Sequence, residues 1–310
     1  MSVAAAAPPR AATLALTAAV ASGALVALQQ RVNGELKTAL GDALLTALVS
    51  FGTGLVAVVA VVLSRPAARE AVRRVRDVPW LQRLGGLGGA SLVAVGAAAA
   101  PEIGVALLTV GLVAGQTTGG LVLDRAGWGP SGRHALTTPR VTGAALCLVA
   151  VAISVAGDGA RAASPLLILL VVGAGFLIAV QQALNGQVRR TTGDAGVATL
   201  VNFAVGTLAL GLGVLVHTAV AGQDVGQWPG PAQWYLYLGG PMGATFVAVA
   251  AMIVRTLGVL RLGLAVTAGQ LVGALLLDLL LPVSDAGVAL LTVVGVALTL
   301  VAVQVSGRRS

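Results

Sequence analysis

The stretch Gln29-Gln30-Arg31-Val32-Asn33-Gly34-Glu35-Leu36 determines how the rest of the chain is interpreted. It follows a run of small and apolar residues. The same pattern recurs 152 residues later, again after an apolar run, as Gln181-Gln182-Ala183-Leu184-Asn185-Gly186-Gln187-Val188. Both copies continue to a Gly-Asp pair, at Gly41-Asp42 and at Gly193-Asp194. Because repetition at a fixed spacing is the signature of a duplicated structural unit, the chain consists of two copies of one unit.

The composition restricts the class of protein. Apolar residues make up 57% of the chain and charged residues only 10%, and the mean hydropathy is +0.95. An ordinary soluble domain carries about 25% charged residues, so this chain has too much apolar surface for a soluble core. The apolar runs do not alternate as the strands of a membrane barrel do, and helices are the other way to satisfy backbone groups in lipid. The composition therefore predicts an all-α polytopic membrane protein.

The apolar runs predict ten transmembrane helices, each about as long as a helix needs to cross roughly 30 Å of hydrocarbon. Their ranges are 12–32, 43–63, 84–100, 103–123, 138–156, 165–184, 196–219, 234–254, 257–281 and 285–305. The first five form one repeat at residues 12–157, and the last five form a second repeat at 165–305. We expect a linker at 158–164, a disordered N-terminal tail at 1–11 and a C-terminal tail at 306–310.

An odd number of spans in each copy makes the second copy enter the membrane from the opposite side, which gives inverted repeats. The basic residues support this topology. With both termini on one side, 16 of the 19 Lys and Arg residues lie on that side, and Arg31, Lys37 and Arg161 lie on the other. The positive-inside rule then places both termini and the Arg-rich loop 64–83 in the cytoplasm. Because the arginines lie between apolar runs rather than on one face, the net charge of +8 does not indicate a nucleic-acid partner.

Amide side chains recur in both copies of the opening stretch. Gln29 and Asn33 are four residues apart and share one helix face, as do Gln181 and Asn185. Amides both donate and accept hydrogen bonds, which suits the binding of a polar solute without burial of a net charge. The same amides could instead tie helices together, a use worth roughly 0.5–2 kcal/mol per bond in membranes. Both interpretations remain open, and duplication does not separate them.

Other polar positions recur inside the spans. Ser50-Phe51 matches Asn202-Phe203 at the same spacing, and Gly115-Gln116 matches Gly269-Gln270 at a spacing of 154 residues. Gln116 and Gln270 lie near the middle of their spans, where an unpaired amide costs several kcal/mol. Inverted-repeat transporters bind their substrates at this depth. We therefore expect Gln116 and Gln270 at the centre of a pathway, with Asn202 as a weaker candidate for substrate binding.

Asp124 and Asp278 end matching spans in the two copies. Both are candidates for ion coupling. Asp124 adjoins Arg125 and is most simply an interfacial residue, so Asp278, with leucine on both sides, is the better candidate. The single cysteine and the two histidines have no partners at metal-ligand spacing. The sequence also contains no phosphate loop and no nucleophile-base pattern. We therefore expect no enzyme, no cofactor and no metal site.

These motifs resemble the drug/metabolite transporter (DMT) superfamily, and within it the YdcZ-like (DUF606) branch. The matching residues are the early Gln-x-x-x-Asn-Gly, the Ser/Asn-Phe of the next span, and Gln-Leu-Val-Gly-x-Leu-Leu-Leu-Asp at 270–278. The resemblance implies a ten-helix, EamA-like inverted-repeat fold with a central cavity. Multidrug relatives with four helices use a glutamate in the first span for proton exchange. This chain has no equivalent glutamate, so that mechanism is not carried over.

The sequence favours a secondary transporter that works by alternating access in the cytoplasmic membrane, and the resemblance implies that it moves a small metabolite or drug-like solute. Its expected partners are the solute and the lipid bilayer, and the chain is expected to be a monomer or a homodimer. One alternative is a scaffold, sensor or assembly subunit in which the amides only lock helices. Another is a lipid permease, which would be favoured by a cavity that opens sideways to lipid.

Overall fold

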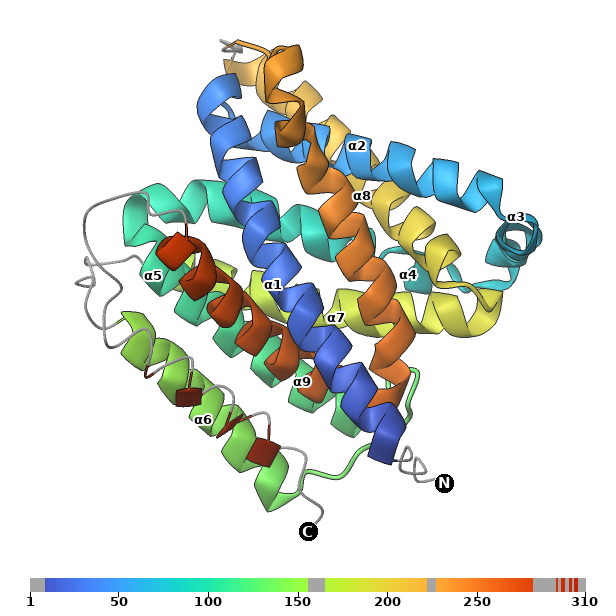
Figure 1. Ribbon diagram of the computed structural model, residues 1–310, viewed down its shortest axis with the longest axis vertical. Helices are drawn as coiled ribbons and strands as arrows, with labels where there is room; N and C mark the ends of the chain where they lie inside the picture. The colour runs from blue at the N-terminus through green and yellow to red at the C-terminus, as the bar shows by residue number, and fades with distance from the viewer. Residues whose placement is uncertain are drawn as a thin grey trace.

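The computed structural model describes residues 9–155, 165–221 and 227–280, together with a few helical residues between 294 and 305. Within these ranges all regular structure is helical (Figure 1). The α-helices are α1 (Pro9–Leu40), α2 (Ala43–Ser64), α3 (Pro66–Arg73), α4 (Trp80–Arg83), α5 (Gly86–Ala126), α6 (Thr138–Val155), α7 (Pro165–Thr192), α8 (Ala195–Ala221) and α9 (Gly239–Leu280). Two 3-10 segments, η1 (Arg74–Asp77) and η2 (Pro231–Leu238), complete the described structure.

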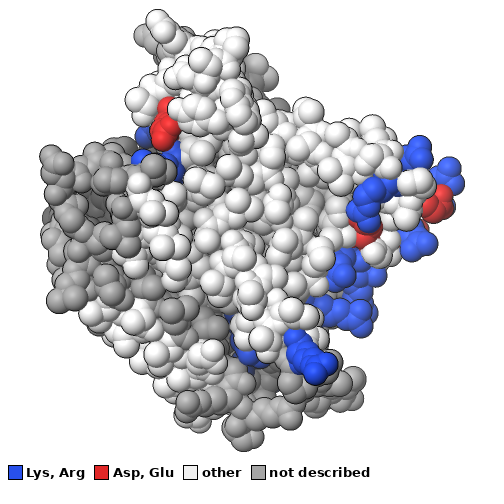
Figure 2. Space-filling view, in the orientation of Figure 1, with Lys and Arg blue, Asp and Glu red and all other residues white. Residues whose placement is uncertain are grey.

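Five of the described helices are long and apolar enough to cross a membrane. They are Arg10–Leu40, Ala43–Ser64, Pro165–Thr192, Ala195–Val220 and Pro231–Leu277. Much of the outer surface between the charged ends is apolar, and α8 alone exposes Leu208, Leu212, Leu215 and Val216. Figure 2 shows Lys and Arg side chains gathered along the edge of the molecule where α3 lies, beside a broad uncharged surface. The prediction of an all-α polytopic membrane protein is confirmed.

Two helices are each long enough to contain two of the predicted spans. α5 has 41 residues and α9 has 42, so each would measure about 60 Å, twice the thickness of the hydrocarbon core. α9 is broken at Gly258, where φ is 77° and ψ is 168°, so the break lies just inside the start of the predicted span 257–281 and four residues after the predicted end of span 234–254. Glycine adopts such backbone angles readily.

The remaining predicted boundaries differ in detail from the structure. α1 begins at Pro9, inside the range predicted as a disordered tail, and proline suits the first position of a helix. The predicted linker 158–164 lies outside the described residues, as do residues 306–310. Of the last predicted span, 285–305, the structure describes only the few helical residues already mentioned.

The repeated Gly-Asp pair forms the same turn in both copies. Gly41 and Gly193 have φ angles of 76° and 79°, so each ends a helix in the left-handed region that glycine tolerates. The aspartate that follows caps the next helix. Asp42 accepts a hydrogen bond from the Leu45 N–H at 2.5 Å, and Asp194 accepts one from the Val197 N–H at 3.1 Å. The sequence repeat is therefore a structural repeat.

Glycines bring helices of the two copies into backbone contact. α1 packs along α9, and α5 packs along α7 (Figure 1). A methyl group at Gly115 in α5 would overlap the carbonyl oxygen of Val172 in α7. A methyl group at Gly269 in α9 would overlap the carbonyl oxygen of Val20 in α1. These are the same contact in the two copies, and each joins a helix of one copy to a helix of the other.

Phe51 in α2 and Phe203 in α8 occupy the same position in the two copies. Their ring centroids lie 5.0 Å apart, within the range of a favourable aromatic pair. Two equivalent residues can touch each other only near the axis that relates the two copies. The axis of the duplication therefore passes between these rings, where α2 crosses α8.

A matched pair of substitutions in α7 tests the close packing. A Cβ at Gly175 would overlap the Leu112 carbonyl, whereas a Cβ at Gly173 would have no neighbour within 4 Å. We expect Gly175→Ala to lower the melting temperature in detergent, because overpacking of this kind costs about 1–3 kcal/mol. Gly173→Ala should leave it unchanged or raise it, because alanine favours a helix by up to about 1 kcal/mol. Equal effects of the two substitutions would contradict the packing described.

Candidate functional site

A cavity of about 370 Å³ lies between the two copies, a volume in the range of known ligand pockets. Its walls come from α1, α2, α5, α7, α8 and α9. The lining residues are Val26, Gln29, Gln30, Asn33, Gly34, Lys37, Ala43, Thr46, Ala47, Ser50, Phe51, Gly89, Leu92, Val93, Gly96, Gln181, Asn202, Phe203, Gly243, Phe246 and Val247. Four of the predicted site residues, Gln29, Asn33, Gln181 and Asn202, are among them.

One stripe of α1 forms a polar wall of the cavity. Gln29, Asn33 and Lys37 follow one another at intervals of four residues, so they share one face over about 12 Å. Lys37 is exposed to solvent. A Cβ at Gly34 would have no neighbour within 4 Å. The cavity therefore opens at the Lys37 end of α1, which we call the Lys37 mouth.

The second copy contributes the buried end of the cavity. Gln181 and Asn202 are both more than nine-tenths buried. The Asn202 amide donates a hydrogen bond to Asn185 Oδ1 at 3.1 Å, which places Asn185 behind Asn202 rather than in the cavity lining. The oxygen of the Gln181 side chain is buried, and within the described part of the chain it has no hydrogen-bond partner.

Two equivalent glutamines lie against two equivalent glycines in the cavity wall. A Cβ at Gly243 in α9 would lie 2.5 Å from Gln29 Nε2, and a Cβ at Gly89 in α5 would lie 3.1 Å from Gln181 Oε1. All four residues line the cavity. Glycine at these positions leaves room for an amide beside the helix backbone, so the duplicated Gly-Gln contact helps to form the cavity.

The two copies differ at the ends of their polar stripes. Gly186 is the equivalent of Gly34, but it is tightly packed, since a Cβ there would lie 2.5 Å from Pro130 and 2.6 Å from Val254. The position that is open space in the first copy is thus filled by neighbouring side chains in the second. The end of α7 that corresponds to the Lys37 mouth is closed.

Hydrogen bonds reinforce the closed end. Arg189 is the equivalent of Lys37, and it donates to the Met252 carbonyl of α9 at 2.9 Å. Gln187 donates to the Trp128 carbonyl at 3.0 Å. These contacts hold α7 against α9 and against the loop after α5. We call this end the Arg189 mouth.

Gln116 and Gln270 do not line this cavity. Both are half-buried, and the Gln116 amide lies beside Gly263 of α9, 3.4 Å from where a Cβ would stand. Gln270 lies on the part of α9 that packs against Gly23 of α1. Their expected place at the centre of a pathway remains a prediction, which this cavity does not support.

Asp124 is an anchor between helices. It is fully buried, accepts hydrogen bonds from the Val259 and Leu260 N–H groups at 2.8 and 3.2 Å, and pairs with Arg140. It therefore caps the half of α9 that begins after the break at Gly258. The structure pairs Asp124 with Arg140 rather than with the adjacent Arg125, and the predicted interfacial position and role in ion coupling of Asp124 stay predictions. The Asp278 side chain lies outside the described part of the structure.

Sequence reasoning missed several lining residues, above all Lys37. A lysine at the end of a span was interpreted only as a topology signal. Lys37 lies four residues after Asn33 and so on the same helix face, and this spacing could have indicated that Lys37 continues the polar stripe. Phe51, Phe203 and Phe246 form apolar parts of the wall, and nothing in their local sequence separates them from lipid-facing residues.

Replacement of Asp124 tests its role as an anchor. We expect Asp124→Asn to destabilise the protein by about 3–5 kcal/mol, because it leaves the Arg140 guanidinium buried without its counter-charge. The double variant Asp124→Leu with Arg140→Leu should be more stable than Asp124→Leu alone. Thermal unfolding of the purified variants measures both effects. A change below about 1 kcal/mol for Asp124→Asn would show that the pair contributes little.

Comparisons with known proteins agree with this fold. The family model DMT_YdcZ, described as "Putative inner membrane exporter, YdcZ", matches residues 14–153 and again residues 166–305. A solved structure described as "Crystal structure of protein" is 22% identical, with a TM-score of 0.70 over 97% of each chain, which shows a shared fold. No curated protein is significantly similar to the chain. The resemblance seen in the sequence motifs is confirmed, and the chain belongs to the YdcZ family of drug/metabolite transporters, with one family unit in each of its two copies.

Proposed function

We propose that the chain is a secondary transporter that moves a small metabolite or drug-like solute across the cytoplasmic membrane by alternating access. Its two five-helix repeats would cross the membrane in ten spans with inverted topology. Membership of a family described as inner membrane exporters supports transport. The main support for the mechanism is that two equivalent positions differ in packing. Gly34 faces open space, whereas Gly186 is closely packed by neighbouring side chains.

The duplication explains how one chain could alternate between two states. If each copy can adopt either the open or the closed arrangement, exchange of the two arrangements closes the Lys37 mouth and opens the Arg189 mouth. Equivalent sequences make the two states similar in energy, so modest differences in contact energy decide which is populated. By the predicted topology the Lys37 mouth faces outward, and the present structure is an outward-open state.

The lining favours certain solutes. Amides and the hydroxyls of Thr46 and Ser50 supply hydrogen bonds, while phenylalanines supply apolar contact. Among the lining residues of the described structure no carboxylate occurs, and Lys37 is the one charged side chain. A buried cation without a counter-charge costs several kcal/mol. The cavity therefore suits an uncharged or anionic polar solute, with the free Gln181 oxygen available to accept a hydrogen bond.

The two alternative functions fit less well. A helix-locking role accounts for Asn185 and Asn202, which bond to each other. It does not account for Gln29 and Asn33, whose side chains face a cavity of ligand size. A lipid permease would need a lateral opening, whereas the residues that mark the opening, Gly34 and Lys37, lie at a helix end.

Flux measurements test the site. We propose a proteoliposome uptake screen of uncharged and anionic metabolites, followed by assays of Gln29→Leu and Gln181→Leu with the solute identified. Loss of one or two hydrogen bonds should reduce flux about tenfold or more. Gln116→Leu and Gln270→Leu are matched controls, since these amides lie outside the cavity. Loss of flux in the controls alone would reject the cavity as the substrate site and support the midspan glutamines.

Accessibility in intact cells tests the orientation. We expect Gly34→Cys to react with a membrane-impermeant maleimide from outside, because the Lys37 mouth is open. Arg69→Cys, in the Arg-rich segment, should react only after the cells are permeabilised. The native Cys147 is buried and should give little background. The reverse pattern of labelling would overturn the proposed topology.

A further inference from the structure

We propose that two equivalent ion pairs act as latches on the two mouths, and that their unequal strength selects the open one. This inference rests on the proposed alternating-access function. Arg65 Nη2 lies 2.9 Å from Asp194 Oδ2. His217 Nε2 lies 4.0 Å from Asp42 Oδ2. At the repeat spacing of 152 residues, His217 is the equivalent of Arg65 and Asp194 is the equivalent of Asp42, so these are two copies of one contact.

The two pairs lie on opposite sides of the axis between the copies. Arg65 follows the last residue of α2, and Asp194 precedes the first residue of α8. At the other end, Asp42 precedes α2, and His217 lies in the last turns of α8. Each pair thus joins the end of one helix to the start of the other. With α2 at 22 residues, the pairs are about 30 Å apart.

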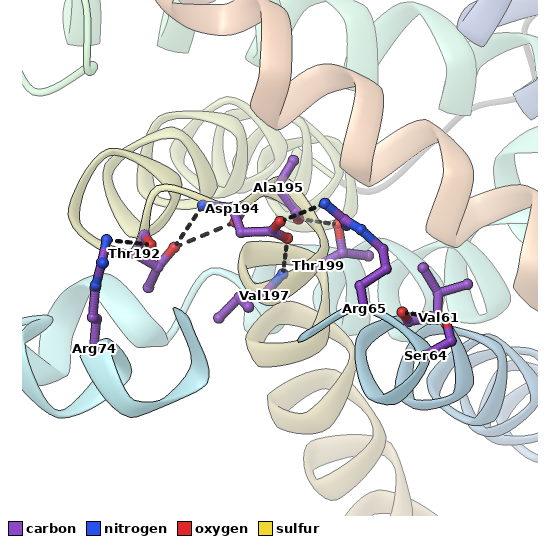
Figure 3. A network of polar contacts seen from close by, with 9 residues as sticks. All are labelled: Val61, Ser64, Arg65, Arg74, Thr192, Asp194, Ala195, Val197 and Thr199. Carbon is purple, nitrogen blue, oxygen red and sulfur yellow. Dashed lines mark hydrogen bonds and ion pairs between the residues drawn. The ribbon is translucent and has the colours of Figure 1, made fainter. Parts of the chain in front are cut away.

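The Arg65–Asp194 latch belongs to a larger network, shown in Figure 3. Asp194 also caps α8 through the Val197 N–H, and its side chain is only 12% exposed. Arg74, from η1, donates to the carbonyl oxygen of Thr192 at 3.5 Å. The segment after α2 is therefore tied at two points to the turn between α7 and α8. This network lies at the end of α7 that carries the closed Arg189 mouth.

The His217–Asp42 latch is weaker. The separation of 4.0 Å is at the limit for an ion pair. The two basic side chains are about equally exposed, at 48% and 50%, but the Asp42 side chain is 22% exposed against 12% for Asp194. Histidine carries a charge only when it is protonated, whereas arginine is always charged and can present two donors to one carboxylate. The Lys37 mouth, which lies beside this latch at the start of α2, is the open one. The stronger pair accompanies the closed mouth and the weaker pair accompanies the open mouth.

Exchange of the two basic residues tests this inference. In the double variant Arg65→His with His217→Arg, the strong latch moves to the Lys37 mouth. Reporter cysteines at Gly34 and at Gln187 measure the opening of the two mouths. Each reporter is compared with and without the exchange, so the loss of the Gln187 hydrogen bond to Trp128 is common to both measurements. Purified protein in lipid nanodiscs exposes both faces to a maleimide, so the two labelling rates can be compared directly. Thermal unfolding of each variant confirms that it is folded.

We expect the exchange to slow labelling at Gly34→Cys about threefold and to speed labelling at Gln187→Cys by a similar factor, the size expected of a partly exposed ion pair. His217→Arg alone should produce part of the shift. Arg69→His is the matched control, because Arg69 is an exposed arginine of α3 whose side chain has no ion pair within the described structure. It should leave both rates unchanged.

Two outcomes would overturn the inference. One is an unchanged pair of labelling rates in a folded exchange variant. The other is the same shift with Arg69→His, which would show a general effect of arginine loss. Failure of the proposed function is distinguishable, because it would appear as absent solute flux in the parent protein, whereas the latch readout uses labelling alone and needs no solute.

Discussion

Backbone contact at Gly115 and Gly269 is the constraint on which the rest of the structure depends. In lipid, helices gain little from burying apolar side chains, so close approach through small residues supplies much of the packing energy. Both contacts join a helix of one copy to a helix of the other, α5 to α7 and α9 to α1. The two copies therefore assemble around each other, and the space left between them is shared. The cavity has walls from both copies for this reason.

That shared space connects the duplication to function. Phe51 and Phe203 mark the axis, and equivalent residues on either side of it form the two mouths. The mouths are in different states although their sequences correspond, as Gly34 and Gly186 show. The open and the closed arrangement both already occur in this fold, one in each copy. The two copies can therefore exchange arrangements without forming any new kind of contact. The transport by alternating access that we propose is the simplest function that uses this arrangement.

The sequence predicted the duplication and the helical class because both follow from residue patterns along the chain. Helix periodicity and the repeat singled out Gln29, Asn33, Gln181 and Asn202, and the structure brings these four residues together in the cavity lining. Their role in substrate binding stays a proposal. Gln116 and Gln270 do not line the cavity, and their place in a pathway stays a prediction, because glycine beside a glutamine equally indicates tight helix packing. The partner of Asp124 could not be predicted, since Arg140 reaches it only through the conformation of the loop after α5.

The proposed mechanism requires the two mouths to open in alternation. Distances between spin labels measure this directly, with one pair across the Lys37 mouth at Thr38 and Gly96 and one pair across the Arg189 mouth at Arg190 and Arg255. With saturating transported solute in nanodiscs, we expect a second population in which the first distance shortens and the second lengthens. Two distances that stay fixed, or that lengthen together, would contradict it.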